Sequence, residues 1–88
     1  MNKDRRKQIA SAIDEIRDLE TRIAAVRENV EHIRDEEQEA FDNIPESLQE
    51  GDRGQAMQSA IDYLDCAVSD LDCIDIESLI ENLESAAE

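Results

Sequence analysis

The sequence predicts an all-α protein: a long antiparallel helical hairpin that pairs with a second copy into a dimeric helical bundle. Two observations support this prediction. Apolar residues recur every three or four positions along both halves of the chain, which is the spacing of one face of a helix. Glycine and proline occur only within residues 45–54, so the chain has one place at which to reverse.

The first predicted helix covers residues 3–43, a stretch without glycine or proline. One heptad frame, which starts at Ile9, extends along it and predicts an apolar seam at its first and fourth positions. The seam residues are Ile9, Ala12, Ile16, Leu19, Ile23, Val26, Val30 and Ile33, with Glu37 next in the same frame. A seam of this kind requires a second helix against it.

The predicted turn covers residues 44–52, because Pro45 disfavours helical geometry in the residue before it. We expect one short helical turn after the proline, with Leu48 folded back against the hairpin. Gly51 and Gly54 then allow the backbone to reverse.

The second predicted helix covers residues 53–87 and lies antiparallel against the first, with Asp52 and Gln55 forming a capping box at its start. Its apolar stripe shifts by about two residues near Asp75. Two interpretations remain open: a stutter in a continuous helix, or a break at which Asp75 caps a short third helix, with Ile74 and Leu79 as a hydrophobic staple. We favour the continuous helix. In either case residues 1–88 form a single helical-hairpin domain.

Additional apolar residues widen the two faces beyond a narrow seam. They are Ile13, Phe41, Ile61, Val68, Ile76 and Ile80. Surplus apolar surface implies a further partner. A homodimer built through these residues is the economical solution, and a helix of the partner protein is the alternative. A chain of this length buries only about 60–65% of its unfolded surface, so self-association would also add stability.

The net charge of -15 is distributed unevenly. Residues 1–34 hold eight Lys or Arg against seven Asp or Glu, whereas residues 35–88 hold one against seventeen. Direct contact with nucleic acid or with anionic lipid would be repulsive, so neither a nucleic acid nor a membrane is expected as a partner. A protein with a basic surface is the partner that this charge predicts.

Two groups of charged residues are the candidate partner-binding surface. The first group lies where the first helix ends; acidic residues there oppose the helix dipole, and such local conflicts are typical of binding sites. The second group follows the second helix. The candidates are Asp35, Glu36, Glu37, Glu39, Asp42 and Arg53 in the first group, and Asp62, Asp65 and Asp72 in the second. Solubility alone is the alternative explanation for both.

No catalytic residue, cofactor or metal site is predicted, because the chain has no glycine-rich phosphate loop, nucleophile-base pair or cluster of metal ligands. His32 is expected at the surface, and Cys66 and Cys73 are expected to be reduced, small packing residues. The basic residues within 3–7 are expected to pair with the acidic C-terminal end. The chain lacks a secretory signal and a long apolar run, so a cytoplasmic location is expected.

The stretch around the turn has a distinctive pattern. It runs Asp35-Glu-Glu-Gln-Glu-Ala-Phe-Asp-Asn-Ile-Pro-Glu-Ser-Leu-Gln49 and continues with Arg53-Gly54, Met57, Ala60-Ile61-Asp62 and Leu64. Over roughly residues 30–72 the chain resembles a family of small acidic helical proteins of bacteriophages and prophages, and it departs from that pattern after Leu71. The resemblance implies a phage setting, in which short acidic proteins bind and inhibit host machinery, including CRISPR effectors and other defence systems. It assigns no functional residues.

Three hypotheses for function follow. The leading one is a non-enzymatic inhibitor that binds a basic surface of a host protein in the host cytoplasm. The second is a structural or assembly protein of a phage particle or complex, for which the apolar seam matters most. The third is a sponge for a small ligand such as a nucleotide at an oligomer interface, which requires Arg17, Arg22 or Arg27 to converge on a pocket.

Overall fold

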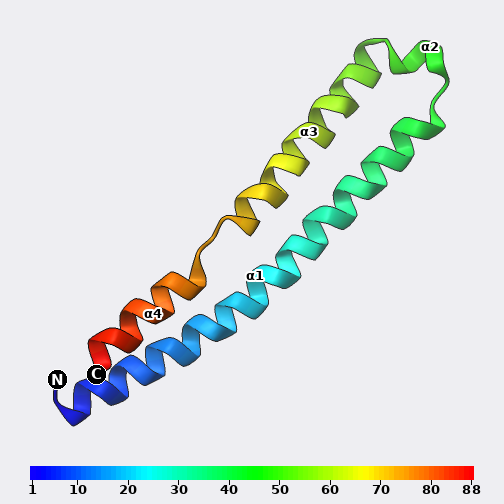
Figure 1. The fold of residues 1–88 in the computed structure, drawn as a ribbon. Coiled ribbons are helices and arrows are strands. Elements are labelled where there is room, and N and C mark those ends of the chain that lie inside the picture. The colour runs from blue at the N-terminus through cyan, green and yellow to red at the C-terminus, as the bar shows by residue number, and fades with distance from the viewer. The chain divides into compact units, whose positions relative to one another are not determined.

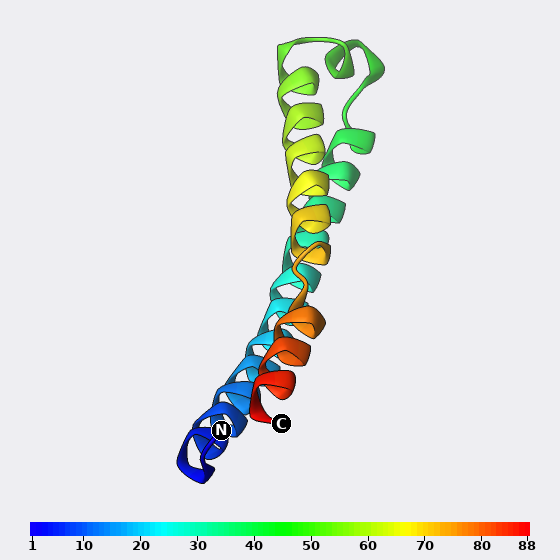
Figure 2. The same ribbon diagram turned by 60° about the vertical axis from the view of Figure 1, so that its left-hand side comes forward.

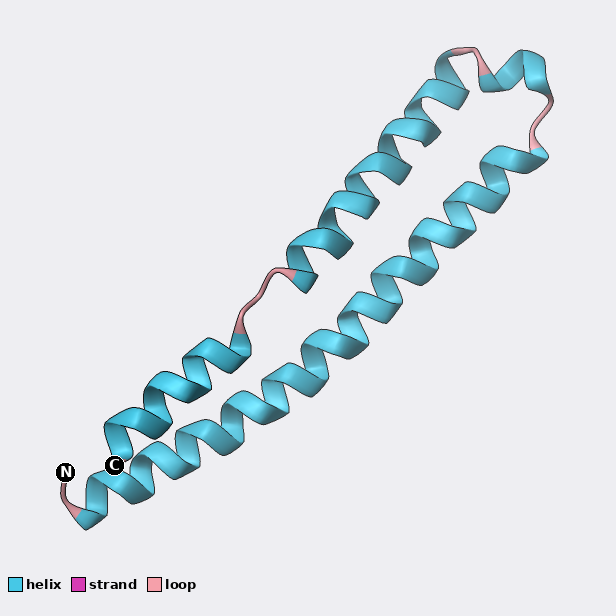
Figure 3. Cartoon of the chain, in the orientation of Figure 1, coloured by secondary structure: helices cyan, strands magenta, loops and turns pink.

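The computed structural model describes all of residues 1–88 and contains only helices and the loops that join them (Figure 3). The helices are α1 (Lys3–Asn43), α2 (Glu46–Gln49), α3 (Asp52–Asp72) and α4 (Ile76–Ala87). The predicted all-α fold is therefore confirmed.

The long helix α1 is uninterrupted because its sequence contains no helix breaker. It begins after Asn2, whose side-chain Oδ1 accepts a hydrogen bond from the backbone N–H of Arg5 at 2.8 Å. This contact satisfies one of the donors that the first turn of a helix leaves free. The helix ends at Asn43, two residues before Pro45.

The chain divides into two compact units. We call Val26–Cys73 the corner unit; it contains the second part of α1 together with α2 and α3. We call Met1–Ala25 with Ile74–Glu88 the terminal unit; it contains the first part of α1 together with α4. Within the corner unit α1 runs antiparallel to α3, and within the terminal unit it runs antiparallel to α4 (Figure 1, Figure 2).

The face that α1 turns to its partner helices differs from the predicted seam. The first heptad position is half-buried at Ile9, Ile16, Ile23 and Val30. The fourth position is largely exposed: Leu19, Val26 and Ile33 are 48%, 49% and 52% exposed. Its place is taken by the half-buried fifth position, which holds Ile13, Glu20, Arg27, Arg34 and Phe41. The predicted seam is therefore wrong in one of its two rows, because ion pairs from Arg27 and Arg34 to α3 hold the fifth position inward.

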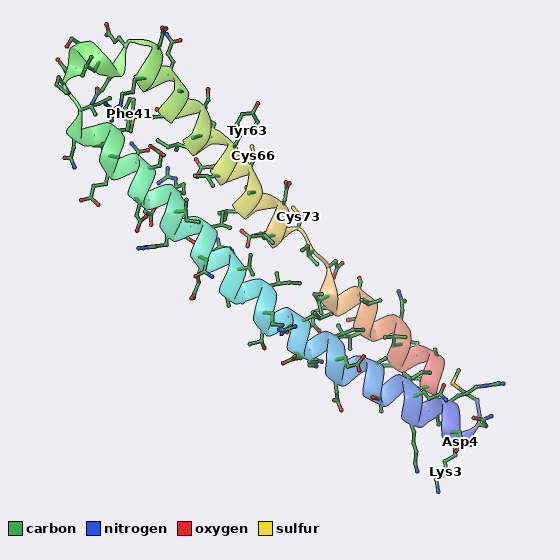
Figure 4. The ribbon with its side chains drawn as sticks, turned by 180° about the vertical axis from the view of Figure 1, so that it is seen from behind. Lys3, Asp4, Phe41, Tyr63, Cys66 and Cys73 are labelled. Atoms are coloured by element: carbon green, nitrogen blue, oxygen red, sulfur yellow. The ribbon has the colours of Figure 1, made fainter.

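The fully buried core is small. Ile61 on α3 lies in the corner unit and Ile80 on α4 lies in the terminal unit, and each is 1% exposed. The prediction that both contribute to a dimer interface is wrong, because side chains so completely buried within the chain have no surface left for a second copy. The other residues predicted for that interface, Ile13, Phe41, Val68 and Ile76, are half-buried. Figure 4 shows the Phe41 side chain between α1 and α3.

The corner is tied to α1 by Gln49. Its side-chain Nε2 donates hydrogen bonds to the backbone carbonyls of Phe41 at 3.0 Å and Ile44 at 3.3 Å. These carbonyls belong to the C-terminal end of α1, where a helix leaves acceptors free. Leu48 was expected to fold back against the hairpin, but it is 47% exposed, so that prediction is wrong.

Gly54 permits a close approach of two backbone segments. It is buried within α3, and a Cβ at this position would lie 2.0 Å from the carbonyl oxygen of Gln49. Neither glycine has a positive φ, so the expectation that glycine flexibility makes the reversal is wrong. Gly51 is the N-cap of α3, and no side chain caps this helix. The predicted capping box at Asp52 is therefore also wrong.

The second half of the chain breaks between α3 and α4. Asp75 is the N-cap of α4, and its Oδ1 accepts a hydrogen bond from the backbone N–H of Ser78 at 2.9 Å. The favoured continuous helix is therefore wrong, and the alternative with Asp75 as a cap is correct. Hydrogen bonds from the backbone and side chain of Ser78 lower the pKa of Asp75, because they favour the charged carboxylate.

Gly54→Ala should destabilise the corner unit. Inside a helix this substitution normally stabilises by up to about 1 kcal/mol, but here the new Cβ meets backbone atoms that must shift. We expect a net loss of about 1–3 kcal/mol in chemical denaturation followed by circular dichroism. Gly51→Ser is the matched control: its Cβ has room, and its hydroxyl can cap α3, so stability should hold or rise. Similar losses in both variants would contradict the close approach.

The cap at Asp75 should make α4 sensitive to acid. A carboxylate whose pKa is lowered by folding stabilises the protein above its unfolded pKa, and this contribution is lost as the pH falls through its folded pKa, below 3.8. Asp75→Asn keeps a capping side chain that does not titrate. The wild type should have a higher thermal midpoint than Asp75→Asn at neutral pH, and this difference should become smaller as the pH is lowered into that range. A constant difference across the range would argue against the cap.

Candidate partner-binding surface

Two arginines of α1 reach across to α3 in the corner unit. Arg27 makes a two-pronged contact with Asp72, from Nε to Oδ1 at 2.5 Å and from Nη2 to Oδ2 at 3.2 Å. Arg34 Nε donates to Asp65 Oδ1 at 2.8 Å. The two arginines are seven residues apart, as are the two aspartates, so both bridges share one register. Hydrogen bonding to Asp72 raises the pKa of Arg27, and hydrogen bonding to Asp65 raises the pKa of Arg34.

These bridges change the role of two predicted partner-binding residues. Asp65 and Asp72 are each 53% exposed, so the bridges determine register more than they add stability. Their charges are already matched within the chain and attract an outside partner weakly. Asp62, the third member of the predicted row, accepts a hydrogen bond from Gln58 Nε2 at 3.3 Å and forms no ion pair.

In the terminal unit a single ion pair connects α1 and α4. Arg17 Nη1 lies 3.3 Å from Glu77 Oε1. The basic residues of the first helical turns, Lys3, Arg5, Arg6 and Lys7, form no ion pair, so the expectation that they bind the acidic C-terminal end is wrong. Lys3 projects from the end of α1 (Figure 4).

Three of the predicted acidic residues on α1 have partners or are partly covered. Asp35 Oδ1 lies 3.3 Å from Arg34 Nη1, and Glu36 Oε1 lies 2.8 Å from His32 Nε2. Glu37 is half-buried. Their charge is therefore partly satisfied within the chain.

Negative charge that forms no ion pair extends along the corner itself. Glu39 and Asp42 are exposed and form no ion pair, and the exposed Arg53 also forms none. Three further carboxylates continue this group through α2 into α3, and sequence reasoning missed them. We call the group the corner acids: Glu39, Asp42, Glu46, Glu50 and Asp52, all exposed and all without ion pairs. The acidic residues between Pro45 and Gly54 could have indicated this surface from the sequence. They were not considered because the segment was assigned to a turn.

Both cysteines lie at the surface of α3. Cys66 and Cys73 are free and exposed, so the prediction that they are packing residues is wrong. Tyr63 on the same helix is 77% exposed and projects away from α1 (Figure 4). This side of α3 is otherwise polar, so it offers no extended apolar surface.

A shallow, open depression of about 320 Å³ lies on α1 in the corner unit. It is lined by Arg27, Glu28, Glu31, His32 and Asp35. Three of these side chains are carboxylates, and Arg27 is already bound to Glu31 at 2.7 Å and to Asp72. A negative lining of this kind does not suit the phosphates of a nucleotide.

No three His, Cys, Asp or Glu side chains gather closely enough to hold a metal ion. None of the helices combines the length and the hydropathy needed to cross a bilayer. Comparisons with protein-family models, curated proteins and solved structures found no match. The functional argument therefore depends on the surface of this chain.

Loss of the charge on Asp72 should weaken the contact between α1 and α3. Asp72→Asn breaks the bridge to Arg27, whereas Asp70→Asn, on the same helix, removes an exposed carboxylate without an ion pair. We expect a lower thermal midpoint for the first variant and an equal or higher one for the second, because its net negative charge is reduced. In an Arg27→Gln background Asp72→Asn should behave as Asp70→Asn does and should not lower the thermal midpoint further. Equal effects in both backgrounds would show that the bridge does not contribute.

Proposed function

We propose that this chain is a protein-binding module that acts without catalysis and presents the corner acids to a basic surface of a partner protein. One observation supports the proposal most directly. The corner acids form no ion pairs, whereas Arg17, Arg27 and Arg34 of α1 are all bound to carboxylates of α3 or α4. Charge that is matched within the chain attracts little, so the unpaired corner is the stronger electrostatic contact surface.

The ends of the helices strengthen this negative potential. α1 ends without a basic residue in its last turn, so the partial negative charge of its C-terminus adds to that of Glu39 and Asp42. The partial positive charge at the start of α3 offsets only the nearby Asp52. Because the corner acids are exposed, attraction extends over about one Debye length, roughly 8 Å at physiological salt. Such a field accelerates association with a basic partner.

The partner class that fits best is a protein whose basic surface binds nucleic acid. A series of exposed carboxylates on a helical surface can take the place of a row of phosphates on such a protein. The resemblance of residues 30–72 to phage proteins favours a host protein in the host cytoplasm, such as a component of a defence system. In this proposal occupation of the basic surface inhibits the host protein.

A structural or assembly role in a phage complex is the second candidate, and one observation favours it. Leu19, Val26 and Ile33 leave about half of their surface exposed along α1, which is typical of a contact surface. In that role the apolar residues carry the contact and the corner acids only maintain solubility. Nucleotide binding has less support, because Arg17 and Arg27 are engaged by carboxylates.

Charge reversal at the corner should abolish partner binding. We expect immobilised wild-type chain to capture a host protein from lysate and to release it in a salt gradient, because salt screens exposed charges. The variant Glu39→Lys/Asp42→Lys/Glu46→Lys should not retain that protein. If the immobilised wild type still retained this protein at high salt, the electrostatic argument would fail.

A matched control separates the corner from the total charge. Glu81→Lys/Glu84→Lys/Glu88→Lys changes the net charge by the same amount through exposed residues of the terminal unit. This control variant should capture the host protein as the wild type does. Equal loss in both variants would show that only net charge matters, and retention by both would favour the structural role.

A further inference from the structure

α1 leaves a regular row of apolar side chains uncovered. The row occupies the fourth position of the heptad frame that starts at Ile9. Its exposed members are Leu19, Val26, Ile33 and Ala40. They lie seven residues apart on one uninterrupted helix, so they share one side of it. We call them the apolar row.

A second row lies beside the apolar row, on the side away from α3 and α4. It occupies the seventh heptad position and consists of Glu15, Arg22, Asn29 and Glu36, all exposed. In helical bundles this position borders the contact with a neighbouring helix, and its charges select the partner and its orientation. The second row therefore indicates which helix can cover the apolar row.

A second copy of α1 in antiparallel orientation complements this row. With a two-fold axis near Asn29, Arg22 of each copy faces Glu36 of the other, and Asn29 faces its own counterpart. The same register places Val26 against Ile33 and Leu19 against Ala40. In a parallel pair the seventh position of one copy would instead face the apolar first position of the other, so Arg22 and Glu36 would have no opposite charge across the contact.

We propose that the apolar row is a self-association surface, through which two chains pair by antiparallel α1 helices about a two-fold axis near Asn29. The contact spans residues 19–40, about 30 Å at 1.5 Å per residue. The half-buried Ile23 and Val30 lie beside the row and enlarge the apolar contact. This surface differs from the dimer interface that the sequence predicted.

Self-association and the proposed partner binding use different sides of α1. With 3.6 residues per turn, Asp42 lies about 160° around the helix from the apolar row and Glu39 about 100° from it. Glu36 belongs to the dimer contact, where Arg22 of the second copy would replace its present neighbour His32. Charge reversal at the corner leaves Glu36 unchanged, so either proposal can fail without the other.

Sedimentation equilibrium of the wild type and of Ile33→Glu tests the pairing. The wild type should show twice the monomer mass of 10.0 kDa, and Ile33→Glu should show the monomer mass, because the pairing would bury an unpaired carboxylate. Circular dichroism should show that the variant keeps its helices, since Ile33 is 52% exposed. Tyr63→Glu on α3 is the control and should remain dimeric. A monomeric wild type, or a dimeric Ile33→Glu, would overturn the proposal.

A disulfide across the two-fold axis tests the register. In a Cys66→Ser/Cys73→Ser background, which changes two exposed residues, Asn29→Cys should form a covalent dimer on mild oxidation. Glu28→Cys places a thiol on the neighbouring residue but away from the contact, and should remain uncrosslinked. Equal crosslinking of the two variants would exclude the proposed register.

Charge exchange tests the orientation. Arg22→Glu and Glu36→Arg should each weaken the dimer several-fold, because each creates two like-charge contacts across the interface. The double variant restores opposite charges and should recover the wild-type dissociation constant. If the effects of the two substitutions on the dissociation constant were additive in the double variant, antiparallel pairing would be contradicted.

Discussion

The rotation of α1 about its own axis depends on two ion pairs that repeat at the heptad spacing. Arg27 with Asp72 and Arg34 with Asp65 bring the fifth heptad position of α1 inward, so the fourth position remains outside. With only Ile61 and Ile80 fully buried, apolar packing alone selects this rotation weakly. The exposure of the apolar row follows from this one geometric choice.

The positions of the helices could be predicted because several local signals agree. The apolar spacing, the absence of breakers before Asn43 and the cluster of proline and glycine after it all indicate the same elements. The rotation of α1 could not be predicted in the same way. Leu19, Val26 and Ile33 are more apolar than Glu20, Arg27 and Arg34, and periodicity ranks helix faces by hydropathy. The arginines become inward residues only when aspartates on α3 meet them, and no local pattern reveals that pairing.

The sequence could predict where the candidate surface lies but not which acidic residues form it. The charge count indicates the region after residue 35, but it cannot tell a matched carboxylate from an unmatched one. Asp65 and Asp72 find their arginines 31 and 45 residues away in the sequence. Glu46, Glu50 and Asp52 escaped notice because their segment had been assigned to a turn. Counting charges therefore overstates the free charge on α3 and understates it at the corner.

The break at residues 73–75 also determines how the chain gains and loses structure. Helical hydrogen bonding cannot propagate from α3 into α4 through this break, so α4 must nucleate separately. A helix of 12 residues is marginal on its own in water. Its persistence therefore depends on the Asp75 cap and on the burial of Ile80. Fraying that starts at the C-terminus stops at the break, and α3 keeps its hydrogen bonds while α4 opens and closes.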